Sequence, residues 1–223
     1  MSKNIYAIYG ASGFGREVMP LVKNAFSTET GADFVFIDDG VTEEFINGVK
    51  ALSFDEFMKL ESEDKFVCLA IANSKTRDVL FKKLADNGLK HLSIHAKNSV
   101  VMDFVEIGEN CILAPFTAIT SNVKIGKAFH ANLYSYIAHD CVIGDFVTFA
   151  PGVKCNGNVH VHHHAYIGTG AIIKQGKPNK PLVIGEGAVV AAGAVVTKSV
   201  PPGITVFGNP AVPLTKENMR KMR

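Results

Sequence analysis

A large aliphatic residue recurs every six positions through the second half of the chain. From Ile107 to Ile173 the six-residue step meets twelve positions, and nine of them hold Ile, Leu or Val. The position four residues after each step is nearly always small or β-branched. A period of six is neither helical nor simply alternating. It predicts short strands joined by turns, with one large and one small residue facing inward in each repeat.

The repeat has one interruption. Ile184 follows Ile173 by five positions more than the six-residue step, so five extra residues leave the period within "KQGKPNKP". The step then resumes at Ile184 and is expected to continue to Pro202. An internal repeat with a short fixed period indicates a solenoid.

This repeat resembles the hexapeptide-repeat acyltransferases, which fold as a left-handed parallel β-helix. The resemblance implies triangular coils of three hexapeptides, in which residues three hexapeptides apart stack. Small Ala131 then leaves room beside large Phe149 in the same column. Three cysteines fall in inward slots and are expected to be free thiols that act as small buried apolar side chains: Cys111, Cys141 and Cys155.

The first 95 residues have a different pattern. Buried-strand runs such as "IYAIY", "FVFIDD" and "KFVCLAIAN" alternate with helical stretches. Ser53 and Glu56 are spaced as a helix capping box, and Gly88 closes a later amphipathic helix. The alternation predicts an α/β domain with a small parallel, Rossmann-like sheet over residues 1–95. The β-helix is expected over residues 96–212, followed by a basic C-terminal tail over residues 213–223.

The stretch "GASGFG", Gly10–Gly15, follows the first strand run and precedes a helix. Glycines in that position let backbone N–H groups approach phosphate oxygens at a helix N-terminus. Asp38 ends the next strand run, where a ribose-binding acid belongs in such folds. A tight turn with a solvated acid pair explains the same residues, so this pattern alone leaves nucleotide binding open.

Together the two domains resemble the bacterial nucleotide-sugar acetyltransferases, which include relatives of the sialic acid O-acetyltransferase type. The resemblance implies that the small domain holds the nucleotide sugar and the β-helix holds acetyl-CoA. It assigns the nucleotide to these residues of the first domain: Gly10, Ser12, Gly13, Asp38, Asp39 and Asn73. Some members have a histidine in the glycine loop where this chain has Phe14, so that side-chain contact is absent here.

His139 is the candidate catalytic residue among eight histidines. It lies in an outward slot, and Gly157 follows three hexapeptides later, so the stack would leave a groove beside the imidazole that is wide enough for a thioester. Asp140 could orient the ring and stabilise an imidazolium. In the resembled family, such a histidine–acid pair is the general base with its orienting carboxylate. A purely structural histidine is the alternative.

The resemblance also indicates positions for the acceptor and the coenzyme. Asn132 matches a family position near the acceptor, and a backbone N–H near Gly157 would stabilise the oxyanion. Thr148 stands where some members have a second histidine that contacts acetyl-CoA. The residues expected near the coenzyme are Thr148, Gly157, Thr169, Lys174 and Ala192. Three lysines of the interruption could bind the phosphates of the coenzyme or belong only to an exposed loop: Lys174, Lys177 and Lys180.

Composition and charge argue against several classes of protein. The net charge of +2 gives no strong field for nucleic acid or a membrane surface. No apolar run approaches the roughly 20 residues that span a bilayer, and the N-terminus has the pattern of a buried strand rather than a secretory signal. The expected compartment is the cytoplasm. In "HVHHH", residues 160–164, the histidines are expected to point outward because Val161 and Ala165 fill inward slots, so no metal is expected.

We therefore expect an acetyl-CoA-dependent N-acetyltransferase that acts on the amino group of a nucleotide-linked amino sugar in bacterial surface glycan biosynthesis, such as that of the O-antigen of lipopolysaccharide. His139 would act as general base in a direct attack, without an acyl-enzyme. A homotrimer with shared active sites is expected, because outward apolar residues near Tyr134, Tyr136 and Phe146 need cover.

Three alternatives stay open. One is an O-acetyltransferase of the sialic acid type, which acts on a sugar hydroxyl. Another is a zinc lyase like γ-class carbonic anhydrase, which needs three converging histidines. The third is a non-catalytic nucleotide-binding scaffold, which the stack of His139 on Gly157 disfavours.

Overall fold

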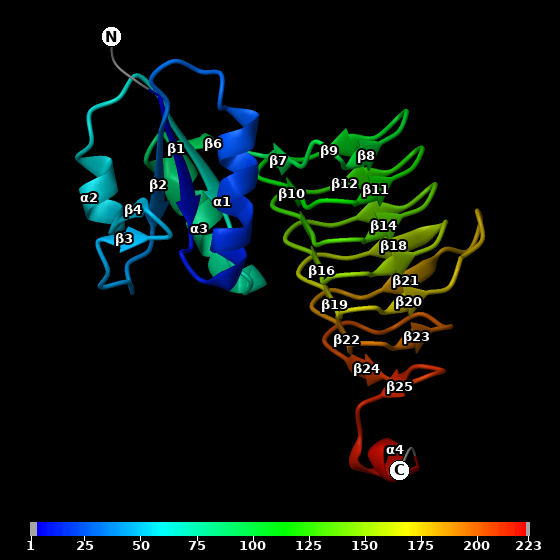
Figure 1. Cartoon of the computed structure of the whole chain (residues 1–223). Helices are drawn as coiled ribbons and strands as arrows, with labels where there is room; N and C mark the ends of the chain where they lie inside the picture. Colours follow the sequence, from blue (N-terminus) through cyan, green and yellow to red (C-terminus); the bar gives the residue numbers. More distant parts are fainter. Residues whose placement is uncertain (1–3, 222–223) are drawn as a thin grey trace. The chain divides into compact units, whose positions relative to one another are not determined.

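The computed structural model describes residues 4–221. The chain divides into two compact units. The first contains the residues up to His95 together with Glu109–Cys111, and the second contains Ala96–Gly108 and the residues from Ile112 onward. Figure 1 shows the first as a sheet with helices and the second as a stack of flat coils.

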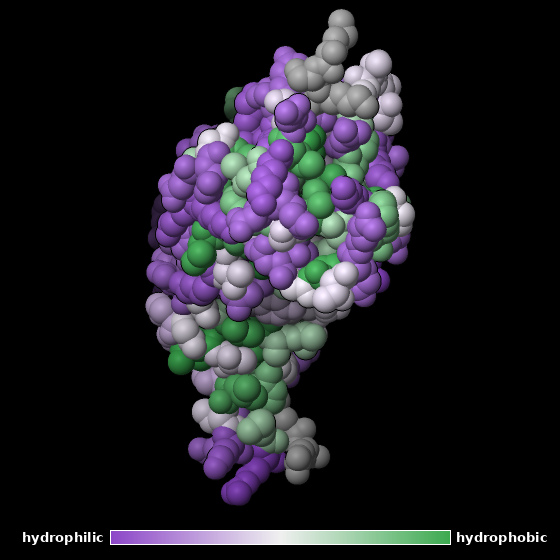
Figure 2. All heavy atoms as spheres, turned by 90° about the vertical axis from the view of Figure 1, so that its left-hand side faces the viewer, coloured by the Kyte–Doolittle hydropathy of each residue, from purple (hydrophilic) through white to green (hydrophobic). Residues whose placement is uncertain are grey.

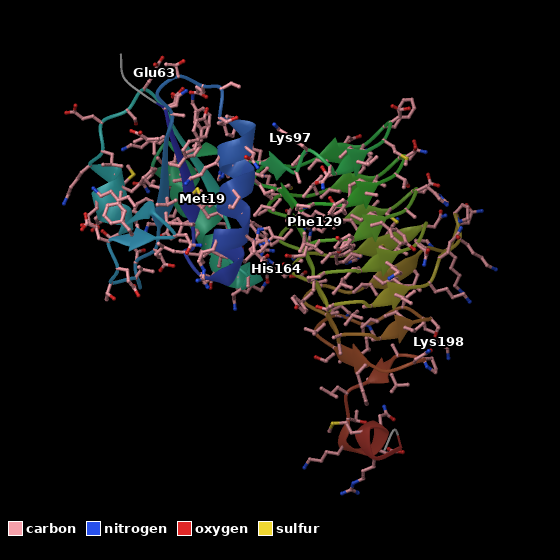
Figure 3. The ribbon with its side chains drawn as sticks, in the orientation of Figure 1. Met19, Glu63, Lys97, Phe129, His164 and Lys198 are labelled. Carbon is pink, nitrogen blue, oxygen red and sulfur yellow. The ribbon has the colours of Figure 1, made fainter. Side chains whose placement is uncertain are left out.

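The α/β unit is built around a sheet with the strand order β3-β4-β2-β1-β5-β6. Its elements are β1 (Ile5–Tyr9), α1 (Gly13–Ala25), β2 (Asp33–Ile37), β3 (Phe45–Ile46), β4 (Val49–Leu52), α2 (Phe54–Met58), β5 (Lys65–Leu69), α3 (Ser74–Asp86), β6 (Lys90–His91) and β7 (Ile94–His95). Strand β1 is buried along its whole length and pairs in parallel with β2 and β5. Helix α1 buries Val18, Met19 and Val22, and Met19 is labelled in Figure 3.

One hairpin departs from the predicted parallel sheet, which is therefore mixed. Strands β3 and β4 are antiparallel, with Ile46 opposite Val49. Asn47 and Gly48 join them with φ values of 48° and 72°. Two left-handed residues in succession are typical of a type I′ turn, for which Asn-Gly is a strong sequence signal. The hairpin could have been predicted from that dipeptide.

The predicted helix ends are confirmed. Ser53 Oγ accepts a hydrogen bond from the Glu56 N–H, and a Glu56 carboxylate oxygen accepts one from the Ser53 N–H at 2.9 Å. At the end of α3, Gly88 has a φ of 68° and the Leu89 N–H donates to the Leu84 carbonyl. This is the bonding of a Schellman motif, in which glycine takes the left-handed position.

The second unit is a parallel β-helix of three sheets, as predicted. One sheet holds β10 (Ile112–Leu113), β13 (His130–Ala131), β16 (Thr148–Phe149), β19 (Tyr166–Ile167), β22 (Val189–Val190), β24 (Thr205–Phe207) and β25 (Val212–Pro213). Another holds β8 (Val100–Val101), β11 (Ala118–Ile119), β14 (Tyr136–Ile137), β17 (Lys154–Cys155), β20 (Ile172–Ile173) and β23 (Val195–Val196). The third holds β9 (Glu106–Ile107), β12 (Lys124–Ile125), β15 (Val142–Ile143), β18 (Val159–Val161) and β21 (Leu182–Ile184). Helix α4 (Lys216–Lys221) follows.

The predicted stacking of every third hexapeptide is confirmed by the strand register. Ala131 pairs with Phe149, and Ile137 pairs with Cys155. Phe149 fills the space beside Ala131 and meets the ring of Phe129 edge-on, with centroids 5.3 Å apart (Figure 3 labels Phe129). Cys111, Cys141 and Cys155 are all fully buried, so these thiols do serve as small apolar side chains.

Most corners of the coils have a residue in the left-handed region, and from Phe104 to Gly170 the φ of this residue lies between 48° and 71°. From the first coil to the interruption these corners come every six residues, and most are not glycine: Phe104, Asn110, Phe116, Asn122, Ala128, Tyr134, Asp140, Phe146, Gly152, Asn158, His164 and Gly170. The pairing of three sheets fixes this conformation even for bulky side chains, which rarely adopt it otherwise.

The predicted interruption is confirmed, but the expected return of the period at Pro202 is wrong. Val161 pairs with Ile184, which lies five positions beyond the partner that a regular coil would give it, so five residues loop out between β20 and β21. Ile184 then meets Val200, which is buried, whereas Pro202 is exposed. The last coil is two residues shorter than the others, because only four residues separate the inward Val196 from Val200 where a regular step has six.

The outward apolar residues of the β-helix differ in part from those expected. Phe146 is buried and stacks on His164 with centroids 5.2 Å apart, so it needs no cover (Figure 3 labels His164). Tyr134 is 64% exposed and stacks on Phe116. Phe104 is 82% exposed.

Figure 2 shows hydrophilic side chains over much of the visible face of the α/β unit, with smaller apolar areas between them. Among residues 4–221, no helix has both the length and the apolar character needed to cross a membrane.

Candidate active site

His139 and Asp140 lie at a corner of the β-helix, between β14 and β15. Asp140 takes the left-handed corner position with a φ of 57°, which Asp tolerates better than most residues. The carboxylate thereby faces the preceding side chain, and Asp140 Oδ2 lies 2.7 Å from His139 Nδ1. Each side chain is 49% exposed, so the pair is open to a substrate.

The contact determines which ring nitrogen of His139 can act as a base. A carboxylate only accepts hydrogen bonds, so in the neutral ring Nδ1 carries the proton and Nε2 keeps its lone pair. The nearby pair of His163 and Asp145 has the opposite arrangement. There Nδ1 of His163 accepts the backbone N–H of Asp145 at 2.9 Å, so the proton of the neutral ring is on Nε2. Of these two pairs, only His139 presents an unprotonated Nε2 to solvent.

The expected stack of Gly157 on His139 is confirmed, and the space where a Gly157 side chain would begin is taken by the imidazole. A Cβ atom on Gly157 would lie 2.6 Å from both Cε1 and Nε2 of the imidazole. The ring itself therefore occupies this space, so glycine fits beneath it and a larger residue does not. The glycine therefore makes room for the imidazole, and a groove for the thioester beside the ring stays a prediction.

The backbone beside the imidazole offers a free donor. The neighbouring N–H groups of Asn156 and Asn158 donate to Ile173 and His139 carbonyls. The Gly157 N–H donates to no acceptor within residues 4–221. A free N–H next to a candidate base is the arrangement that stabilises a developing oxyanion.

The other predicted coenzyme and acceptor positions are spread over different corners and faces. Asn132 uses its side-chain amide to donate to the Phe149 carbonyl at 2.8 Å, which leaves its Oδ1 as an acceptor. Thr148 is buried on β16. Thr169 and Ala192 are exposed. They occupy equivalent positions on neighbouring coils, at a corner other than that of His139. Lys174 lies on the corner of His139, at the start of the interrupting loop.

In the α/β unit, three of the predicted nucleotide residues follow adjacent parallel strands. Gly10, Asp38 and Asn73 come after β1, β2 and β5, whose carboxyl ends meet at one edge of the sheet. Ligands of open α/β sheets bind at this edge, where connections leave neighbouring strands in opposite directions.

The glycines of the loop have different roles. Gly10 has a φ of 103°, and a Cβ on Gly15 would lie 1.8 Å from the Gly10 carbonyl oxygen, so both are needed for the turn. A Cβ on Gly13 would meet nothing within 4 Å. Ser12 is the N-cap of α1 but its side chain makes no capping bond, and no acid lies in the first turn. The exposed start of α1 can therefore attract an anion.

The two aspartates hold the loops of this edge together. Asp38 accepts hydrogen bonds from the Ala11 and Gly40 N–H groups at 2.9 and 3.0 Å. Asp39 accepts from the Phe54 N–H at 2.7 Å and from the Tyr9 hydroxyl at 2.8 Å. Burial alone would raise the pKa of Asp39, but these two hydrogen bonds and the Lys83 charge hold it below its usual range.

Asn73 also has a structural partner. It is the N-cap of α3, and its Oδ1 accepts from the N–H groups of Lys75 and Thr76 at 3.0 Å. Next to the aspartates is a pocket of about 410 Å³ whose walls include Glu43, Glu44 and Glu56. Its lining offers mainly hydrogen-bond acceptors.

Comparison with known proteins agrees with this geometry. Residues 6–84 match the PglD N-terminal domain family. The whole chain is 50% identical over 210 residues to the GDP-perosamine N-acetyltransferase of Escherichia coli O157:H7, covering 93% of this chain and 95% of that protein. The chain belongs to this family of nucleotide-sugar N-acetyltransferases.

Solved structures of similar proteins have the same fold. WeeI from Acinetobacter baumannii AYE is 59% identical, covers 95% of this chain and 100% of its own, and superimposes with a TM-score of 0.93. The acetyltransferase domain of PglB from Neisseria gonorrhoeae FA1090, in complex with acetyl coenzyme A, is 28% identical with a TM-score of 0.84, over 94% of this chain and 98% of its own.

The pair of His139 and Asp140 has the geometry that a general base with an orienting carboxylate needs. The family membership also overturns the zinc-lyase and scaffold alternatives. The histidines of residues 160–164 are not grouped for metal binding, and within residues 4–221 no three His, Cys, Asp or Glu side chains are so grouped. Val161 and Ala165 are buried as expected, and His162 and His163 are exposed.

Sequence reasoning missed two features near this corner. The Tyr136 hydroxyl donates to Asn156 Oδ1 at 2.9 Å, which ties the coil of His139 to the next coil. Lys198 lines a pocket with the interrupting loop. The signal for Lys198 was present, because the five-residue loop shifts the stack by five and brings residue 198 into the column of His139.

Proposed function

We propose that this protein transfers the acetyl group of acetyl-CoA to the amino group of GDP-perosamine or a closely similar GDP-linked amino sugar. The observation that carries the proposal is the orientation of His139, whose Nδ1 faces Asp140 at 2.7 Å while Nε2 keeps its lone pair. The 50% identity to a GDP-perosamine N-acetyltransferase over nearly the whole chain supports the choice of substrate.

The reaction is a direct acyl transfer. The amine nitrogen attacks the thioester carbonyl while His139 Nε2 takes its proton, and Asp140 stabilises the imidazolium that forms. The carbonyl oxygen becomes an oxyanion that accepts a hydrogen bond from the Gly157 N–H. The C–S bond then breaks, and the proton on His139 goes to the departing thiolate. The products are an amide and free coenzyme A, so the pathway requires no covalent enzyme intermediate.

The nucleotide sugar binds to the α/β unit in this proposal. The start of α1, with Ser12 and Gly13 exposed, takes the diphosphate. The acceptor-rich pocket beside Asp38 and Asp39 takes the base. Guanine suits such a pocket because its N1–H and amino group are donors that carboxylates accept. The remaining lone pairs of both aspartates are available for this purpose.

The active form is a homotrimer in this proposal. Phe104 is 82% exposed and occupies the same column of corners as Asp140, two coils earlier. An exposed aromatic side chain beside a half-exposed catalytic pair needs cover, and a second β-helix would supply it together with a second wall for the coenzyme.

Release of free thiol from acetyl-CoA tests the substrate. The purified protein is supplied with acetyl-CoA and with GDP-perosamine, a UDP-linked amino sugar or sialic acid in turn. We expect thiol release and an N-acetylated product with GDP-perosamine. Equal or faster release with sialic acid would refute the proposal in favour of O-acetylation, and preference for the UDP-linked sugar would refute the assignment of the base.

A further inference from the structure

A basic pocket of about 590 Å³ lies between the interrupting loop and the coil that follows it. The loop contributes Lys174, Lys177 and Lys180, and the next coil contributes Lys198. Within residues 4–221, no acidic residue lines this pocket. Figure 1 shows the loop between β20 and β21 projecting from the edge of the β-helix, and Figure 3 shows Lys198 on that same edge.

The strand register places Lys198 in one column with His139. Ile137 pairs with Cys155, Cys155 with Ile173, and Ile173 with Val196. Two residues beyond these partners come the members of the corner column: His139, Gly157, Gln175 and Lys198. The imidazole already leans along this column, since it lies on Gly157.

The length of the column matches the length of the pantetheine arm. Neighbouring strands are about 4.8 Å apart, so two to three spacings separate the imidazole from Lys198 by roughly 10–14 Å. The arm joins the sulfur of coenzyme A to its diphosphate through about as many bonds as four residues of extended chain, which reach about 14 Å. A thioester at Nε2 therefore brings the diphosphate to Lys198 with little slack.

The walls of the pocket are held by the β-helix. The Gly176 N–H donates to the Gly157 carbonyl and the Leu182 N–H to the Asn158 carbonyl, so the loop leaves and returns on the catalytic corner. Lys177 and Lys180 exchange backbone hydrogen bonds of 3.1 and 2.9 Å. Ser199 Oγ accepts the Val183 N–H at 3.0 Å. The lysines are thus anchored on a fixed frame before any ligand binds.

We infer that Lys198 binds the diphosphate of acetyl-CoA and is a specificity-determining residue of the coenzyme site, with the loop lysines around it. The inference rests on the proposed function for the coenzyme but not for the acceptor sugar. A nucleotide sugar also carries a diphosphate, so the experiment must distinguish binding of the coenzyme diphosphate from binding of the nucleotide-sugar diphosphate.

Calorimetry with coenzyme A and 3′-dephospho-coenzyme A tests the inference without any acceptor. We expect Lys198→Ala to raise the Kd for both compounds by about tenfold, the effect of losing one charge-assisted contact. The control is Lys124→Ala, because Lys124 is exposed on β12 and does not line the pocket. This control should leave both Kd values unchanged. In turnover with acetyl-pantetheine, which has no phosphate, Lys198→Ala should match the wild type.

Each other outcome overturns the inference. An effect on coenzyme A but not on the dephospho compound would assign Lys198 to the 3′-phosphate. An effect confined to the KM of the nucleotide sugar would assign the pocket to that diphosphate. A loss that persists with acetyl-pantetheine would exclude a phosphate contact. Unchanged Kd values would refute this inference alone, whereas a wild-type protein that binds no coenzyme A would refute the proposed function as well.

Discussion

At the scale of single residues, Gly157 is the position of the site that least tolerates a side chain. A Cβ there would lie 2.6 Å from the imidazole, so Gly157→Ala must displace His139. We expect kcat to fall by about 10²-fold, since a shift of about 1 Å in a catalytic group has that effect. Steady-state thiol release measures the change, with circular dichroism to verify the fold.

Gly170→Ala is the matched control for this prediction. Gly170 is also a β-helix corner, but its Cβ would meet nothing within 4 Å. The control should lose some stability because its φ is 68°, yet keep kcat within about twofold of wild type. Equal kcat values for the two alanine variants would mean that the imidazole does not depend on Gly157.

The residue pair itself could be predicted from sequence, but its geometry could not. His139, Asp140 and Gly157 follow from the six-residue period and the stacking of every third hexapeptide. The left-handed φ of Asp140, which turns the carboxylate onto Nδ1, depends on how the chain rounds the corner. The same period also stacks His163 over Asp145, and the backbone donor at Nδ1 distinguishes that pair from the candidate pair of His139 and Asp140.

At the scale of elements, Asp39 joins β2 to the start of α2 and to β1. Its carboxylate accepts from the Phe54 N–H and the Tyr9 hydroxyl, which lowers its pKa. We expect Asp39→Asn to reduce the free energy of unfolding by about 1 kcal/mol at pH 7, a value kept small because the site is partly exposed to solvent. Urea unfolding of the variant and the wild type measures the difference.

The pH dependence of this difference has a definite sign. Because the pKa of Asp39 is lower in the folded protein, its contribution is present above the usual carboxyl pKa of about 3.9 and is lost as the pH falls through the folded value. The difference in the free energy of unfolding between wild type and Asp39→Asn should therefore become smaller in acid. Asp33→Asn, at the exposed start of β2, should have the same free energy of unfolding as the wild type both at pH 7 and in acid. A difference in the free energy of unfolding between wild type and Asp39→Asn that is the same in acid as at pH 7 would contradict the account.

Element boundaries were predictable where one local signal dominates. The capping box of α2, the glycine end of α3 and the five-residue loop were all visible in the sequence. The Asn47–Gly48 hairpin was missed because an alternation of strands and helices suggested parallel pairing throughout. The short last coil was missed because Pro202 falls on the six-residue step, although Val200 is the residue that packs inside.

At the scale of the whole molecule, the exposed apolar corner predicts assembly. Light scattering should give three times the chain mass of 24.0 kDa. Phe104→Asp should weaken this assembly and lower activity together, because Phe104 shares a column with Asp140 and is 82% exposed. A fully active species of single-chain mass would contradict the trimer and the shared site.

The central claim is that His139 is the general base of acetyl transfer, and kcat of His139→Ala tests it most directly. The control is His163→Ala, which removes a similarly exposed imidazole whose Nδ1 accepts a backbone N–H. With acetyl-CoA and GDP-perosamine, we predict that His139→Ala lowers kcat by about 10²–10⁴-fold while His163→Ala keeps it within about twofold. A His139→Ala variant within about threefold of wild type, with its fold intact, would contradict the account.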